Sequence, residues 1–490
     1  MLLIILLGLS FILVQASRPY NDISISDLSP TQGIILNSLT SPNMLGFNLN
    51  KAGDFNGDGY DDVVIGSPGA TGGFGAVYVI FGSKNGLTDL TVTAGMTGNL
   101  GTVIYGANPG DRLGDSVNHA GDVNGDGIDD IIIGSNLYQY SKGVVYVIYG
   151  SRNPPTEIDL SQGLSINQGF RITGANSFES FGRSGGRAGD INKDGIDDVV
   201  IGADGVSGSK GTAYVIFGKN GPRSNIDLSL GLSPSVGFTI TGAASNHYLG
   251  LAVSDAGDLD GDGIEDFVVG AYGVSGLAGA AYVIYGRNSA FSTIDLSQGL
   301  SPSQGFTITG SSPVAQFGKS IGRAGDFDGD GRSDVIIGAP GESAAYVIFG
   351  NERSALSDLS LSSGIDPKRG LKIKGVGTGS GFGGSVNGAG DINGDEIDDV
   401  IIGASQAGST GKAYVIFGGE NFASEIDLSG GLGSQEGFSV IGASANDYLG
   451  AAVSCAGDVN GDGMSDLIVG AYGVDNNSGA VYLLFTPRNI

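Results

Sequence analysis

The chain has 490 residues, of which 90 are glycine, and 40% of the chain is hydrophobic. Its 51 acidic residues outnumber the 24 basic ones, and the resulting net charge of −27 disfavours nucleic acid and anionic membranes as partners. So much glycine is typical of disorder or of many tight turns, and the short, bounded apolar runs favour short strands joined by turns.

The N-terminus begins with an apolar run from Leu2 to Val14, and Ala16 then completes a small-residue cleavage pattern. This predicts a signal peptide over residues 1–16 and a single mature domain over 17–490. A membrane anchor is the weaker interpretation, because spanning needs about 20 apolar residues. We therefore expect a secreted or cell-surface protein whose mature chain has no transmembrane segment.

A nine-residue acidic loop then recurs seven times along the chain. It reads DFNGDGYDD from Asp54 and DVNGDGIDD from Asp122, and the successive copies are 68, 68, 68, 68, 65 and 67 residues apart. A fixed period of this kind indicates a repeat architecture. The copies are numbered here as loops 1 to 7 and begin at Asp54, Asp122, Asp190, Asp258, Asp326, Asp391 and Asp458.

Each repeat has the pattern of four antiparallel strands. In the third copy, the alternating GFRITG at 169–174 and a glycine-rich segment precede the loop, and the apolar runs DDVVIGA and TAYVIFG follow it. Radially repeated four-stranded units form a β-propeller, so seven copies predict an all-β fold of seven blades. The chain opens with an extra outer-strand pattern at 32–38 and ends after the third strand of the last repeat. Pairing of the two ends is expected to close the ring.

The loop residues have the chemistry of a calcium site. Side-chain oxygens stand at positions 1, 3, 5 and 9, and position 7 offers a backbone carbonyl, a donor set that suits Ca²⁺ better than Mg²⁺. We therefore predict up to seven bound Ca²⁺ ions. The predicted ligands are Asp54, Asn56, Asp58, Tyr60, Asp62, Asp122, Asn124, Asp126, Ile128, Asp130, Asp190, Asn192, Asp194, Ile196, Asp198, Asp258, Asp260, Asp262, Ile264, Asp266, Asp326, Asp328, Asp330, Arg332, Asp334, Asp391, Asn393, Asp395, Ile397, Asp399, Asp458, Asn460, Asp462, Met464 and Asp466.

The alternative is seven Asx-rich turns without metal, but aspartate at positions 1, 5 and 9 of every copy favours calcium. The loops differ in expected affinity. Loops 4 and 5 carry four carboxylates and are expected to bind most tightly. In loop 6, Glu396 replaces the turn glycine, and in loop 3, Lys193 opposes a cation, so these two sites are expected to be weak.

The repeat resembles the FG-GAP repeat of integrin alpha-subunit propellers. The matching residues are Phe181-Gly182, Phe317-Gly318 and Phe382-Gly383 for "FG", and Gly338-Ala339-Pro340 and the similar Gly66-Ser67-Pro68 for "GAP". The resemblance implies calcium loops on one face and ligand contacts on the other. The segments 22–26 and 358–362 match the Asp-x-Ser-x-Ser pattern of an integrin-type adhesion site, but we interpret both as linkers.

The face opposite the calcium loops is the expected site of an extracellular protein or glycan ligand. Its loops vary between repeats and carry aromatic residues, which suit recognition, although packing between blades is the alternative. The candidates are Tyr138, Tyr140, Phe178, Tyr248, Tyr272, Tyr448 and Tyr472.

Three functions remain open from the sequence: a calcium-stabilised adhesion or recognition module, which we favour, a polysaccharide-active enzyme, and an inert coat or matrix protein. The enzyme would use the residues three positions before each loop, if these reach the central channel. They are Lys51, His119, Arg187, Asp255, Arg323, Gly388 and Cys455. Blade-end polar residues are the simpler interpretation, and Cys455 is expected to be a buried, inert thiol.

Overall fold

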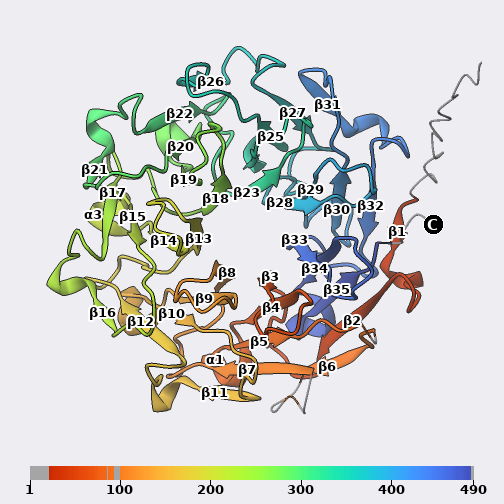
Figure 1. Cartoon of the computed structure of the whole chain (residues 1–490). Helices are drawn as coiled ribbons and strands as arrows, with labels where there is room; N and C mark the ends of the chain where they lie inside the picture. The colour runs from red at the N-terminus through yellow and green to blue at the C-terminus, as the bar shows by residue number, and fades with distance from the viewer. Residues whose placement is uncertain (1–20, 85, 93–95, 97–99, 487–490) are drawn as a thin grey trace, which may run out of the picture.

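The computed structural model of the chain describes residues 21–84, 86–92, 96 and 100–486. Seven radial β-sheets form a ring around a central channel (Figure 1), which confirms the predicted seven-bladed propeller. The predicted signal peptide lies outside the described residues. In the ranges that the structure describes, no helix is long and apolar enough to cross a membrane.

Each blade runs outward from the channel through four antiparallel strands, as the repeat pattern predicts. Listed from the channel outward, the strands are β3 (Asn48–Gly53), β4 (Asp62–Ser67), β5 (Ala76–Ile80) and β7 (Gly101–Tyr105) in blade 1; β8 (Ser116–Gly121), β9 (Asp130–Ser135), β10 (Val144–Ile148) and β12 (Gly169–Thr173) in blade 2; β13 (Gly185–Gly189), β14 (Asp198–Ala203), β15 (Thr212–Ile216) and β17 (Gly237–Thr241) in blade 3; β18 (Val253–Gly257), β19 (Asp266–Ala271), β20 (Ala280–Ile284) and β22 (Gly305–Thr309) in blade 4; β23 (Ile321–Gly325), β24 (Asp334–Ala339), β25 (Ala344–Ile348) and β27 (Gly370–Lys374) in blade 5; β28 (Ser385–Gly390), β29 (Asp399–Ala404), β30 (Lys412–Ile416) and β32 (Gly437–Ile441) in blade 6; and β33 (Ala452–Gly457), β34 (Asp466–Ala471), β35 (Ala480–Leu484) and β2 (Gly33–Ser38) in blade 7.

The ring is closed by the first and last parts of the chain. β2 pairs antiparallel with β35, with Gly33 opposite Leu484 and Asn37 opposite Ala480. The N-terminal strand thus completes the last blade, as expected from the extra strand pattern at 32–38. Without this pairing β35 would present an unpaired edge, which is a template for aggregation.

A fifth, short strand lies at the outer edge of every blade and was not predicted. It pairs in parallel with the outer strand and comes from a connection that the sequence suggested was a linker. These edge strands are β11 (Glu157–Asp159), β16 (Ile226–Asp227), β21 (Ile294–Asp295), β26 (Leu359–Ser360), β31 (Glu425–Asp427), β1 (Ile23–Ser24) and β6 (Leu90–Val92), for blades 1 to 7 in turn. Each blade is therefore joined to a segment from the connection of the next repeat.

The two Asp-x-Ser-x-Ser segments belong to these edge connections. The carboxylate of Asp22 accepts hydrogen bonds from the backbone nitrogen (2.8 Å) and hydroxyl (2.7 Å) of Ser439, and that of Asp358 accepts one from the backbone nitrogen of Thr307 at 2.8 Å. Both aspartates hold an edge connection to an outer strand, in agreement with the linker interpretation.

Single-turn helices occupy connections of the blades. Those between the second and third strands are α1 (Ala70–Gly73), α2 (Tyr138–Ser141), α3 (Val206–Ser209), α4 (Val274–Leu277), α5 (Val474–Asn477) and the 3-10 turn η6 (Pro340–Glu342). The other 3-10 turns follow edge strands and are η1 (Ile25–Asp27), η3 (Leu160–Gln162), η4 (Leu228–Leu230), η5 (Leu296–Gln298) and η7 (Leu428–Gly430).

The repeated glycines let neighbouring blades approach closely. A Cβ on Gly338, in β24, would lie 2.0 Å from the carbonyl oxygen of Gly383 in the next blade, so only glycine fits there. Phe382, which precedes Gly383, is fully buried and packs in a cluster shared by blades 5 and 6. The FG and GAP motifs thus meet across blade interfaces, where the apolar core is divided into seven clusters.

Candidate metal centres and central channel

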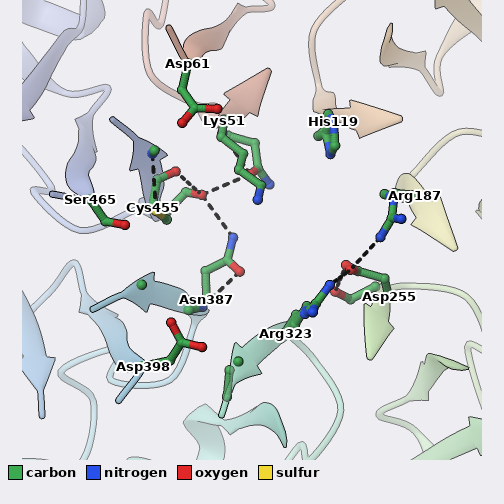
Figure 2. Close-up of a pocket in the computed structure, with 18 of the residues that line it drawn as sticks. Lys51, Asp61, His119, Arg187, Asp255, Arg323, Asn387, Asp398, Cys455 and Ser465 are labelled. Carbon is green, nitrogen blue, oxygen red and sulfur yellow. Dashed lines mark hydrogen bonds and ion pairs between the residues drawn. The ribbon is translucent and has the colours of Figure 1, made fainter. Parts of the chain in front are cut away.

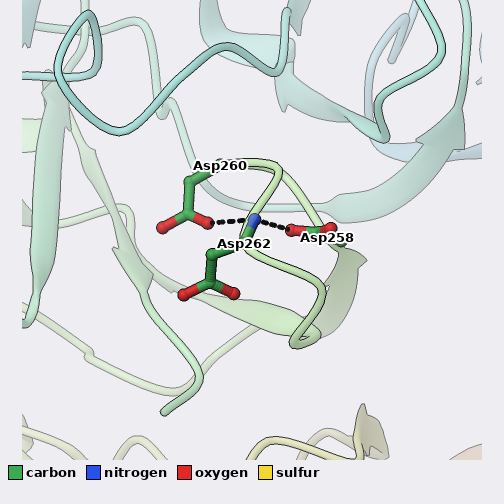
Figure 3. A group of neighbouring side chains, drawn as sticks. All are labelled: Asp258, Asp260 and Asp262. Carbon is green, nitrogen blue, oxygen red and sulfur yellow. Dashed lines mark hydrogen bonds between the residues drawn. The ribbon is translucent and has the colours of Figure 1, made fainter.

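All seven acidic loops connect the first and second strands of a blade and share two hydrogen bonds, from the position-6 nitrogen to the position-1 carboxylate and from the position-7 nitrogen to the position-5 carboxylate. Six of them, all but loop 5, add a bond from the position-5 nitrogen to the position-1 carboxylate. In loop 4, the carboxylate of Asp258 accepts hydrogen bonds from the backbone nitrogens of Asp262 (3.0 Å) and Gly263 (2.8 Å). The carboxylate of Asp262 accepts one from Ile264 at 3.0 Å. These bonds curl the loop so that positions 1, 3 and 5 converge, as Figure 3 shows for Asp258, Asp260 and Asp262.

Position 9 of each loop is a fully buried aspartate. In loop 4, Asp266 accepts hydrogen bonds from the backbone nitrogens of Leu259 (3.1 Å) and Gly286 (2.8 Å), so it ties the loop to the body of the blade. Burial is the main reason why the pKa of these groups is raised in the metal-free protein. It reaches about 8 for Asp62, Asp198, Asp399 and Asp466. A buried carboxylate is stable as an anion when a cation lies beside it.

The donor groups fit a hard cation. The carboxylate oxygens of two trios lie within 4.8 Å of one another, in the two loops that carry four carboxylates: Asp258, Asp260 and Asp262, and Asp326, Asp328 and Asp334. Three buried oxygens at ligand positions have no hydrogen-bond donor: Oδ1 of Asp326, Oδ1 of Asn192 and Oδ2 of Asp198. Oxygens that converge without donors are what Ca²⁺ binds, so the loops suit the ion that the sequence predicts.

The two loops that were expected to be weak contain strained residues. Positions 4 and 6 adopt positive φ in every loop and are otherwise glycine. Lys193, at position 4 of loop 3, has φ of +60°, and Glu396, at position 6 of loop 6, has φ of +71°. The left-handed region is costly for residues with a Cβ, which agrees with the expectation that these loops are less favourable.

Position 8 links each loop to its neighbour, a role that the sequence analysis missed. Asp129, at position 8 of loop 2, accepts a hydrogen bond from the backbone nitrogen of Asp54 in loop 1 at 2.9 Å. Glycine at the β-bulge before the loop makes room for this carboxylate, since a Cβ on Gly53 would lie 2.3 Å from it. Five interfaces use a carboxylate in this way, from Asp61, Asp129, Asp197, Glu265 and Asp398. The signal was the acidic doublet that ends these loops.

The central channel contains a pocket of about 530 Å³ at the end where the acidic loops lie. All seven residues that lie three positions before the loops reach the channel and line this pocket, and Figure 2 labels all of them except Gly388. The bulge in each innermost strand precedes the loop directly and lies beside these residues. They are Lys51, His119, Arg187, Asp255, Arg323, Gly388 and Cys455.

The arginines of the channel are paired with acidic groups. Arg187 lies 2.6 Å from Asp197 and 2.7 Å from Glu265, and Arg323 lies 3.4 Å from Asp255. Burial alone would raise the pKa of Asp255, but the two arginines outweigh it and lower the pKa. The two arginines therefore belong to one salt-bridge network along one wall.

The opposite wall of the channel is largely neutral. It carries Asn387, Ser454 and Cys455, and the hydroxyl of Ser454 accepts a hydrogen bond from Asn387 Nδ2 at 3.1 Å. Burial raises the pKa of the Cys455 thiol, whose sulfur accepts a hydrogen bond from the backbone nitrogen of Gly457 at 3.2 Å. Cys455 is partly exposed in the channel and not buried as predicted, while its raised pKa and its hydrogen bond are consistent with an unreactive thiol.

The aromatic candidates on the opposite face fall into three groups. Tyr140 and Phe178 are 83% and 74% exposed, and the backbone nitrogen of Phe178 donates a hydrogen bond to the carbonyl oxygen of Tyr140. Tyr138 is buried in the core between blades 1 and 2, which removes it from the ligand face. The other four form two stacked pairs: Tyr248 with Tyr272 at 5.0 Å and Tyr448 with Tyr472 at 5.2 Å.

Comparison with protein families gives the class of this propeller. The FG-GAP repeat matches six segments, at residues 52–80, 116–148, 181–216, 317–353, 382–416 and 450–484, which contain strands of every blade except blade 4. Blade 4 has the same strands and loop. The chain therefore contains FG-GAP repeats within its seven-bladed β-propeller, and it resembles integrin alpha subunits.

The similar curated proteins are integrin alpha subunits. The chain is 32% identical over 238 residues to integrin alpha pat-2 of Caenorhabditis briggsae, 29% over 239 residues to integrin alpha-V of Gallus gallus and 34% over 175 residues to integrin alpha-4 of Xenopus laevis. These matches cover 47%, 48% and 34% of this chain but only 18%, 21% and 15% of the relatives. The chain therefore matches about a fifth or less of each relative.

Proposed function

We propose that this propeller is an extracellular, calcium-stabilised recognition module of the adhesion type. Its ligand face is the one opposite the calcium loops, and calcium has a structural role. The observation that carries the proposal is the exposed pair Tyr140 and Phe178 on that face, beside Leu137, which is 40% exposed. Exposed apolar groups that lie together favour a binding surface over a purely structural one. The similarity to integrin alpha subunits supports the same class of function.

The strained backbone supports the assignment of this surface. Tyr140 and Phe178 have φ of +60° and +68°, and Ser180, in the same connection as Phe178, has φ of +54°. The same turn positions have positive φ in other blades, where they are glycine or asparagine, as at Gly208 and Asn246. Aromatic residues adopt this conformation at a higher cost, and strained residues of this kind cluster at functional sites. The two rings are thus held outward by the fold at a cost, as a preorganised binding surface requires.

Binding of the purified protein to arrays of matrix proteins and glycans, with and without calcium, tests this proposal. Selective binding that needs calcium is expected, and the variant Tyr140→Ser/Phe178→Ser should lose it while keeping the melting temperature. Leu230→Ser is a matched control, because Leu230 is 86% exposed but lies in the connection after β15, away from the proposed surface. Binding that survives the double variant would refute this surface as the ligand site.

A polysaccharide-active enzyme is the alternative, and one contact in the channel favours it. His119 Nε2 lies 2.9 Å from Asp129 Oδ1, and both Lys51 and His119 line the same pocket. A histidine beside a carboxylate is suited to general acid–base catalysis. Against this, Asp129 also holds the backbone of Asp54, which is a structural task. Depolymerisation of glycans that is abolished by His119→Gln, in a protein of unchanged melting temperature, would favour the enzyme.

A further inference from the structure

Loop 4 differs from the other loops because an arginine from blade 5 lies among its carboxylates. Arg353, in the connection between β25 and β26, donates from Nε to Asp260 Oδ2 at 2.5 Å and from Nη2 to Asp262 Oδ2 at 2.9 Å; Nη2 also contacts Asp260. Its guanidinium carbon lies 4.5 Å from the centre of the Tyr285 ring. The Asp260 side chain is fully buried, whereas that of Arg353 is 40% exposed, so the contact is shielded from water on the aspartate side.

Arg353 takes the oxygen atoms that a metal would need. Asp260 and Asp262 stand at positions 3 and 5 of the loop. Their Oδ1 atoms accept hydrogen bonds from the backbone nitrogens of Asp262 (3.1 Å) and Ile264 (3.0 Å), while their Oδ2 atoms face Arg353. A cation that bound both carboxylates through Oδ2 would therefore have to displace the guanidinium.

Loop 5 provides the comparison, because it has the same four carboxylates without this arginine. The corresponding connection of blade 6 brings Phe422, which stacks on Phe327 at 4.9 Å. The ion pair of loop 5 joins its own Arg332 and Asp330, and Oδ1 of Asp326 has no donor. In loop 5 the arginine takes Oδ2 of one carboxylate, that of Asp330, and Oδ1 of Asp326 is open to a cation. In loop 4, Arg353 takes Oδ2 of two carboxylates, those of Asp260 and Asp262.

The interface between blades 4 and 5 also lacks the position-8 carboxylate that is present at five other interfaces. Position 8 of loop 5 is Ser333, whose backbone nitrogen donates to the carbonyl oxygen of Asp258 at 3.4 Å. Its hydroxyl interacts with Arg323 at 3.3 Å. Arg353 therefore supplies a contact between blades 4 and 5 at an interface where no position-8 carboxylate is present.

We propose that Arg353 is a built-in competitor for calcium at loop 4. This inference rests on the proposed calcium function. Loop 4 then fills at a higher free calcium concentration than loop 5, contrary to the expectation from carboxylate number. Filling releases Arg353 and loosens residues 350–358, so the site responds to calcium level while the others serve stability. Displacing one charge-assisted pair is expected to weaken binding by about tenfold or more.

Hydrogen exchange followed by mass spectrometry at increasing calcium tests the proposal, because it reports each loop separately. In the natural protein, the midpoint for residues 258–266 should lie about tenfold or more above that for 326–334, and 350–358 should exchange faster as loop 4 fills. Arg353→Gln should bring the two midpoints together. Arg353→Lys keeps the charge but loses the forked geometry, so it should bring the two midpoints most of the way together.

Arg152→Gln is the matched control for loss of charge. Arg152 lies in the corresponding connection of blade 2 and contacts only a carbonyl oxygen of loop 1, that of Gly57, at 3.5 Å. This variant should leave the midpoint of loop 4 unchanged. Equal midpoints for loops 4 and 5 in the natural protein, or no shift in Arg353→Gln, would overturn the competitor role. If no loop responds to calcium, the calcium function itself fails.

Discussion

Removal of calcium is expected to reverse the way in which stability depends on pH. The seven position-9 aspartates are fully buried, and in the metal-free protein desolvation raises the pKa of Asp62, Asp198, Asp399 and Asp466 to about 8. In the unfolded chain an aspartate titrates near 4. Between pH 4 and 8 the folded, metal-free chain therefore binds more protons than the unfolded chain.

The sign and size of the effect follow from this difference in bound protons. A group whose pKa is raised by folding stabilises the fold fully below its unfolded pKa, and this contribution is lost as the pH rises through its folded pKa. Each aspartate changes the free energy of unfolding by up to about 1.4 kcal/mol per pH unit, so four together change it by up to about 5 kcal/mol per pH unit. Whole domains are stable by only roughly 5–15 kcal/mol. Metal-free protein should therefore be folded near pH 5 and open or unfolded at pH 7.5.

Bound calcium keeps the same carboxylates ionised, so the loaded protein should be more stable at pH 7.5 than at pH 5. Calorimetry of both forms at the two pH values measures this. The metal should be removed on a chelating resin, because EGTA binds calcium poorly in acid. Asp266→Asn, which removes one buried carboxyl, should reduce the slope of the metal-free form. A melting temperature of metal-free protein that is unchanged or higher at pH 7.5 would refute the reasoning.

Three further predictions concern single residues. Gly338→Ala should lower the free energy of unfolding by about 3 kcal/mol or more, because its Cβ would clash with the Gly383 carbonyl. Gly331→Ala, which has open space around it, should lower it by about 1 kcal/mol. Denaturant titrations compare the two variants, and equal losses would contradict the close-packing argument. Glu396→Gly should stabilise the protein by about 0.5–1 kcal/mol and tighten calcium binding at loop 6, because Glu396 has a φ of +71° that glycine adopts without strain. An unchanged denaturation midpoint would count against backbone strain at this residue. Asp398→Ser introduces the serine that stands at position 8 of two other interfaces. Loss of the hydrogen bond to the Asp326 nitrogen should weaken calcium binding at loop 5 by about 1–2 kcal/mol. A calcium titration followed by hydrogen exchange of residues 326–334 measures this, and an unaltered calcium midpoint would exclude coupling between blades.

The blades and loops were predictable because their signals repeat. Seven copies of one loop at a near-constant spacing determine the number of blades, and the extra pattern at 32–38 predicts how the ring closes. The edge strands were not predictable in this way, because segments such as Ile226–Asp227 are too short for an alternating pattern to be recognised.

The other features that could not be predicted from the sequence depend on how distant residues are placed in the fold. Asp129 was not among the predicted site residues, and only the neighbouring blade reveals that it holds Asp54. Arg353 is 93 residues from Asp260 in sequence, and no spacing rule connects them. Tyr138 and Tyr140 stand two residues apart in one turn, and the left-handed backbone at Tyr140 places one ring inside and the other outside.

Because of these cross-blade contacts, calcium bound in a loop is expected to stabilise an interface between blades as well as the loop itself. Apolar clusters lie between blades, and the start of loop 1 is held both by its own blade and by Asp129 of the next. An ion bound in that loop therefore fixes an interface as well as a turn, and its loss would loosen two blades together. In loop 4 the corresponding interface has Ser333 in place of the carboxylate and Arg353 in place of an open site. We therefore expect a response to calcium to begin at that interface.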